Sequence, residues 1–191
     1  MSTLLYSLFF LLAQATEIVC ALGPNASSYN AYSDQRPTGD AMQLAGRVNA
    51  ALVSACRPNC PTVAMFRNPT APNIMVIKTP GQAKMVYKPE FLTAVYEAYG
   101  DGGILAILAH EVGHMVDSNA APLWMKREWS SELRADAWAG CAFGRMKLTG
   151  RPLQAAMTTL SKYPSASHPA WTVRSPVVRE GYKQCGGIEE K

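Results

Sequence analysis

One stretch, 104–117, reads ILAILAHEVGHMVD and holds two of the chain's three histidines within one turn of a predicted helix. Its apolar residues recur at helical spacing, which predicts that one face of this helix is buried. On such a helix His110 and His114 are four residues apart and project from one face, with Glu111 beside them. Two imidazoles at this spacing can hold a metal ion, and the carboxylate can take a proton from water. Because polar groups on a buried face need partners, the pattern favours a metal site over a packing helix.

A second helix is predicted from Trp124 to Leu148, ending at Gly150. Within it Glu132 and Asp136 are four residues apart and share a face. If that face meets the first helix, one carboxylate can bind the metal while the other holds a histidine from behind. Spacing leaves open which carboxylate is the ligand. Three protein ligands plus water form a catalytic zinc site, whereas four protein ligands close it.

Composition limits the number of domains and the kinds of partner to be expected. The chain has 191 residues, of which 48% are hydrophobic and 17% charged, so it is long enough for one domain with a core. Its net charge of +4 comes from scattered basic residues. Since these form no run interleaved with aromatic residues, we expect no nucleic-acid partner.

The first residues resemble an export signal. A ten-residue apolar run, 4–13, is followed by Ala13-Gln14-Ala15, a small-x-small cleavage pattern. The run is too short to cross a bilayer, so we expect no membrane span in the mature chain. Cleavage after Ala15 or after Ala21 is compatible with the pattern, as is a buried first helix. We predict a signal peptide in 1–21, an exposed arm over 22–39, and one domain over 40–191, exported to a periplasmic or extracellular space.

The cysteines fit an oxidising compartment. If Cys20 leaves with the signal, the four that remain, Cys56, Cys60, Cys141 and Cys185, can form two disulfides. The turn-forming residues between Cys56 and Cys60 allow a local bridge, and Cys141 would then pair with Cys185. A zinc cluster of cysteines is the alternative, but the second closely spaced pair of such clusters is missing.

The chain between the arm and the motif helix contains short β-type segments. Runs at 62–67, 74–78 and 84–88 are separated by proline-containing loops and predict an antiparallel meander. We expect 84–88 to be an edge strand to which an extended polypeptide substrate could pair.

Helical patterns surround these strands. They cover 40–56 and 89–100, with Asp101-Gly102-Gly103 separating the latter from the motif helix. Further helices begin at Arg151-Pro152 and after His168-Pro169, the last one interrupted by Pro176. The predicted fold class is therefore α+β, mostly helical, with a small antiparallel sheet packed against the motif helix.

Several motifs occur together in one order: HEVGH at 110–114, ELRAD at 132–136, SHP at 167–169, and Arg174 six residues after the last histidine. This set resembles the gluzincin zinc metallopeptidases and, within them, the HtpX-like and CAAX prenyl endopeptidase family. The resemblance covers roughly 74–179. The better-known members have several membrane spans. Because this sequence predicts no span after the signal, it resembles a small exported relative of the family.

The resemblance implies a role for each matching residue. His110, His114 and Glu132 would bind one zinc ion, Glu111 would be the general base, and Asp136 would fix the orientation of a ligating histidine. His168 and Arg174 would lie near the substrate carbonyl or hold the carboxylates of the site. From its position alone, His168 could instead be a capping or buried histidine before Pro169.

Three functions remain in competition. The main expectation is a zinc endopeptidase that hydrolyses peptide bonds of proteins. A zinc-binding module that binds a partner without cleaving is an alternative, although such a module has no need of Glu111. A zinc hydrolase of a small amide is the third, but the deformylases use an upstream cysteine as third ligand, in a setting that Cys56 and Cys60 lack.

Overall fold

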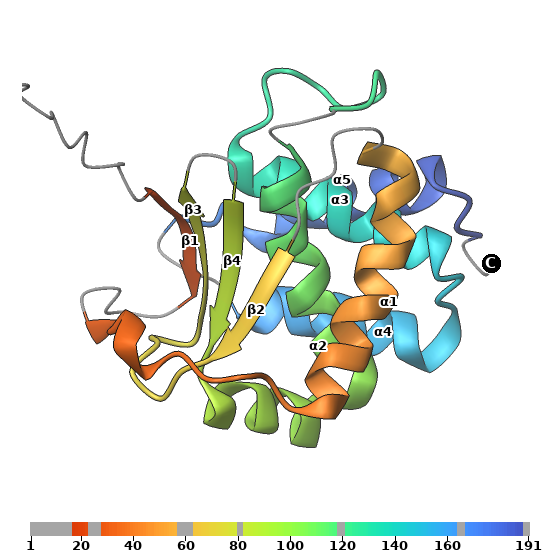
Figure 1. Ribbon diagram of the computed structural model, residues 1–191. Coiled ribbons are helices and arrows are strands. Elements are labelled where there is room, and N and C mark those ends of the chain that lie inside the picture. The colour runs from red at the N-terminus through yellow and green to blue at the C-terminus, as the bar shows by residue number, and fades with distance from the viewer. Residues whose placement is uncertain are drawn as a thin grey trace, which may run out of the picture.

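The computed structural model of the protein describes residues 17–22, 28–56, 63–79, 82–117, 121–163 and 167–188. The strands are β1 (Glu17–Leu22), β2 (Val63–Arg67), β3 (Ile74–Thr79) and β4 (Gln82–Tyr87). The helices are the short 3-10 helix η2 (Ala31–Ser33), α1 (Gly39–Cys56), α2 (Pro89–Asp117), α3 (Ser131–Arg145), α4 (Gly150–Lys162) and α5 (Trp171–Gln184). The predicted α+β class is confirmed: Figure 1 shows a small sheet beside a larger group of helices.

The sheet is mixed, with strand order β1-β3-β4-β2. Strand β3 pairs antiparallel with both β1 and β4, while β2 pairs parallel with β4. The predicted antiparallel meander is therefore wrong in its first strand. Strand β4, which contains most of the predicted edge segment 84–88, lies inside the sheet and cannot accept a substrate strand along its side.

The connection from β2 to β3 explains this order. Asn68 is fully buried, and its side-chain amide donates to the Asn30 carbonyl and to Asp34, each at 2.8 Å. Its carbonyl oxygen accepts from the backbone N–H of Thr70 at 2.8 Å, and its own N–H donates to the carbonyl of Tyr87 at 2.8 Å. These bonds hold the connection across the end of β4, so β3 does not fold back beside β2.

Helix α2 is the centre of the helical layer. It contacts α1, α3 and α4 as well as the strands, and it is buried almost without interruption from Gly102 to Val116. Side chains such as Val76 and Met85 pack from the sheet into the same core. The helix is kinked at Gly100, whose φ of 61° and ψ of −157° are not helical. The predicted break before the motif helix is thus present, but 101–103 already belong to the second half of α2.

The helix predicted from Trp124 begins later than expected. Helix α3 starts at Ser131, and Ser130 caps it by accepting from the Leu133 N–H at 3.4 Å. The preceding residues form turns, in which the Met125 N–H donates to the carbonyl of Pro122 at 2.9 Å. Trp124 and Met125 pack against the core without being helical. Their apolar side chains therefore extended the helical sequence pattern into this loop, which made the predicted start of the helix too early.

Helix α5 is not interrupted. It runs from Trp171 to Gln184 with Pro176 inside it, so the predicted break at that proline is wrong. Extensive packing against α3 outweighs the one hydrogen bond that proline removes. The predicted disulfide Cys141–Cys185 is confirmed and joins α3 to the end of α5, with sulfurs 2.07 Å apart. The Cys56–Cys60 pairing falls outside the side chains that the structure describes.

Most of the predicted signal, 1–16, also falls outside the described residues. Residues 17–22 form β1 at one side of the sheet, so cleavage after Ala15 would keep this strand and cleavage after Ala21 would remove nearly all of it. In the arm, Asp34 forms an ion pair with Lys84 of β4 at 2.7 Å. Among the described residues, none of the helices has the length and hydropathy that a membrane crossing requires.

Candidate metal centre

The motif histidines of α2 meet the first turns of α3. Gly113 lies between the two histidines, and a Cβ there would lie 2.8 Å from the carbonyl oxygen of Ala135. The glycine therefore allows α3 to lie directly against α2. This close approach brings Glu132, three residues before Ala135, to 3.2 Å from His110.

Four donor atoms converge at this point. Nε2 of His110 lies 3.2 Å from Nε2 of His114 and 3.2 Å from Nε2 of His168. Oε2 of Glu132 lies 3.2, 3.4 and 2.8 Å from the nitrogens of His110, His114 and His168 respectively. A tetrahedral ion with bonds of about 2.0 Å separates its ligand atoms by about 3.3 Å. The ligand atoms of His110, Glu132 and His168 all lie within 4.8 Å of one another and could hold a metal ion.

A buried carboxylate holds His110 from behind. Oδ1 of Asp136 lies 3.0 Å from Nδ1 of His110, and Asp136 is fully buried. A neutral imidazole that donates through Nδ1 presents a lone pair at Nε2, the atom that faces the other donors. This contact between a carboxylate and the far nitrogen is what supports a ligating histidine. The geometry thereby places Glu132, and not Asp136, among the converging atoms.

Arg174 of α5 completes this chain of contacts. Its Nε donates to Oδ2 of Asp136 at 2.7 Å and its Nη2 donates to Oδ1 at 2.8 Å, while Nη1 donates to the carbonyl of Leu160 at 3.1 Å. Burial raises the pKa of Asp136, but the contacts with Arg174 and His110 lower it more, so the net pKa lies below its ordinary value. Arg174 thus keeps Asp136 ionised and oriented toward His110.

His168 lies among the converging donor atoms. The resemblance implied that it would lie near the substrate carbonyl or hold the carboxylates of the site, and its position alone also allowed a capping or buried histidine. Its Nε2 lies 2.8 Å from Oε2 of Glu132 and its side chain is 1% exposed, so it is a histidine with a buried side chain that contacts a site carboxylate and lies at the distance of a fourth donor. The adjacent Ser167 donates from Oγ to Oε1 of Glu132 at 3.2 Å. Ser167 has no feature in the sequence that predicts this contact apart from its position beside the third histidine.

The charge of Glu132 is stabilised by its neighbours. Burial raises the pKa of this carboxyl, but hydrogen bonds with His110, His114 and His168 outweigh burial and hold the pKa far below its usual range. Glu132 is therefore a carboxylate at neutral pH, the form that binds metals. Glu111, in the same turn of α2, is fully buried.

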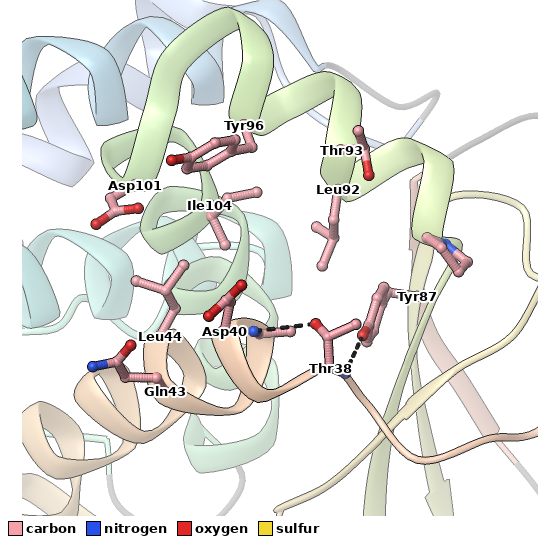
Figure 2. Close-up of a pocket in the computed structure, with 12 residues that line it drawn as sticks. Thr38, Asp40, Gln43, Leu44, Tyr87, Leu92, Thr93, Tyr96, Asp101 and Ile104 are labelled. Atoms are coloured by element: carbon pink, nitrogen blue, oxygen red, sulfur yellow. Dashed lines mark hydrogen bonds between the residues drawn. The ribbon is translucent and has the colours of Figure 1, made fainter.

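A large cavity of the described structure lies apart from these residues. It has a volume of about 440 Å³ and opens between the start of α1 and the part of α2 over 89–104, on both sides of the kink in that helix. Figure 2 shows Leu92, Tyr96 and Ile104 on its α2 side and Leu44 on its α1 side. The metal donors are not among its lining residues, so it adds nothing to the chemistry of the centre.

No family model matches the sequence, and comparisons with curated proteins and with solved structures give no match either.

Proposed function

We propose that the protein is a zinc-dependent endopeptidase, of the gluzincin kind that its motifs resemble. The observation that carries the proposal is the convergence of His110, His114 and Glu132 at the spacing of tetrahedral ligands. Imidazole and carboxylate donors in this geometry suit zinc. The buried Glu111 in the same helical turn supplies a carboxylate that a purely structural site does not need.

When bound, zinc would polarise a carbonyl oxygen and lower the pKa of water to about 7. In the proposed reaction Glu111 takes a proton from the attacking water and delivers it to the leaving nitrogen of the peptide bond. Asp136 and Arg174 do not touch the substrate; they hold the His110 ring in place through its Nδ1. The Cys141–Cys185 disulfide supports the proposed export, because disulfides persist in oxidising compartments.

The first test is metal content. Purified wild-type protein should contain one zinc per chain by elemental analysis, and it should cleave an unstructured protein such as casein. A chelator should abolish cleavage and added zinc should restore it. The double variant His110→Ala/His114→Ala should lose the metal, because two of the converging donors are gone. A wild-type protein that folds without metal and fails to take up zinc would refute the proposal.

A second function is favoured by one observation, the presence of His168 among the donors. Four protein ligands leave no position for water, which is the arrangement of a closed zinc site. A zinc module that binds a partner without cleaving would have this arrangement. For the endopeptidase, His168 must give way before water and substrate can bind.

The variant His168→Ala separates the two functions. In the endopeptidase, His110, His114 and Glu132 retain the metal, and turnover of casein stays the same or rises because the fourth position is open. In the closed module, loss of one ligand weakens zinc binding and produces no turnover. Zinc titration with a competing chelator and a casein assay measure the two quantities on the same sample. A metal-retaining variant with much lower turnover would instead assign His168 to the substrate.

A further inference from the structure

A basic pocket lies at the end of α2 and the start of α3, the two helices that carry His110, His114 and Glu132. It has a volume of about 370 Å³ and is bounded by the end of α2, the loop before α3, the first turns of α3 and Lys78 of β3. One of its lining residues, Asp117, is acidic. Four are basic: Lys78, Lys126, Arg127 and Arg134. Glu128, in the same loop, is not part of the lining.

Two of the basic side chains, those of Arg134 and Lys126, have defined contacts. Nε of Arg134 donates to Oδ2 of Asp117 at 2.7 Å, and Nη1 donates to the carbonyl of Trp129 at 2.8 Å. The other terminal nitrogen of Arg134, Nη2, takes part in neither of these two hydrogen bonds. The ammonium of Lys126 lies 6.0 Å from the centre of the Trp129 ring, and the Trp129 N–H donates to the Lys126 carbonyl. The loop therefore presents its charges from an ordered turn, which reduces the entropic cost of binding an anion.

The pocket is close to the metal centre along both helices. Asp117 is three residues after His114, a rise of about 4.5 Å along α2. Ser131 directly precedes Glu132, and it belongs to the N-terminal turn of α3, whose N–H groups favour negative charge. An extended peptide advances about 3.3 Å per residue. A substrate whose reacting bond lies at the metal would thus bring a residue only a few positions away to this pocket.

We propose that this pocket binds a carboxylate of the polypeptide substrate and so selects for negative charge close to the bond that is cut. The proposal rests on the endopeptidase function. The Arg134–Asp117 pair by itself would only join α3 to the end of α2. That role does not account for Lys126 and Arg127, which are exposed and line the same pocket. The carboxylate is an Asp or Glu side chain or the C-terminus of the peptide, which offer the same chemistry.

Binding to the zinc-loaded Glu111→Gln protein tests the proposal without cleavage. The probes are fluorescent peptides of one sequence: a neutral peptide with a C-terminal amide, a series with one Asp moved along the chain, and the same neutral sequence with a free C-terminus. At least one carboxylate peptide should bind about tenfold tighter than the neutral peptide, as expected for a charge-assisted hydrogen bond. The peptide that gains affinity identifies the source of the carboxylate. The gain should shrink as salt is added.

Two double variants show where the gain arises. In Lys126→Ala/Arg127→Ala the carboxylate peptides should bind no better than the neutral peptide. In Arg47→Ala/Arg151→Ala, which removes the same charge from exposed positions on α1 and α4, the gain should remain. Equal binding of all peptides, no measurable binding of any of them, or equal losses in both variants would overturn the proposal. If wild type cleaves casein while all peptides bind equally, this inference fails alone. If carboxylates bind tighter but nothing is cleaved, the pocket binds carboxylates but the endopeptidase proposal fails, and the role of the pocket in selecting a cleavage site fails with it.

Discussion

Glu111→Gln is expected to fold and to retain zinc, but to lose about 10²- to 10⁴-fold of the wild-type turnover of casein. The substitution keeps the size of a fully buried side chain and removes only its ability to take a proton. Glu111 is not one of the converging donors, so its loss should leave zinc binding unchanged. Turnover and metal content, measured on the same preparation, give both quantities.

Glu97→Gln is the matched control for this variant. It makes the same chemical change on an exposed position of the first half of α2, where it should alter neither turnover nor metal content. If Glu111→Gln cleaves casein at the wild-type rate, Glu111 is not the base. If it loses zinc outright, Glu111 is a ligand and the donor set must be redrawn.

Gly140→Ala is expected to have the largest effect on stability. A Cβ at Gly140 would lie 1.9 Å from the carbonyl oxygen of Val178, and one at Gly181 would lie 2.0 Å from the carbonyl oxygen of Ala137. These two glycines are where α3 and α5 cross. Since backbone atoms of both helices would have to move, Gly140→Ala should cost about 3 kcal/mol of unfolding free energy and lower Tm by roughly 6–12 °C. It should also weaken zinc binding, because the crossing holds Arg174 against Asp136.

Gly46→Ala makes the same change on α1, where an added Cβ meets nothing within 4 Å. Alanine has the higher helix propensity, so this control should be more stable than wild type by about 0.5–1 kcal/mol. Thermal unfolding followed by circular dichroism, with the Cys141–Cys185 disulfide intact, compares the three proteins. A Gly140→Ala protein that unfolds at the wild-type temperature would show that the helices can separate at no cost.

The features that the sequence determined by itself are those set by local periodicity. The 3.6-residue turn places His110 and His114 on one face of α2, whatever the rest of the chain does. The same rule puts Glu132 and Asp136 on one face of α3. Apolar periodicity and turn residues were enough to predict the α+β class. The expectation that Cys20 leaves with a signal peptide left four cysteines, and their spacing predicted Cys141–Cys185.

Other features depend on residues far apart in the chain and could be decided only by the tertiary structure. The place of β4 inside the sheet depends on its pairing with β2 and β3, and the contacts of Asn68 with the arm and with Tyr87 that accompany this pairing have no local signature. The start of α3 at Ser131 could not be predicted from the sequence, because Trp124 and Met125 in the preceding loop pack against the core as residues of a helix would.

The arrangement of the candidate metal centre was equally non-local. Spacing left Glu132 and Asp136 interchangeable, and the packing of α3 on α2 separated them: one faces the donor nitrogens and the other faces Nδ1 of His110. His168 reaches the donors from a segment 58 residues away from His110. Side chains on different elements meet only when the core packs, so their distances are a property of the folded chain and not of any segment within it.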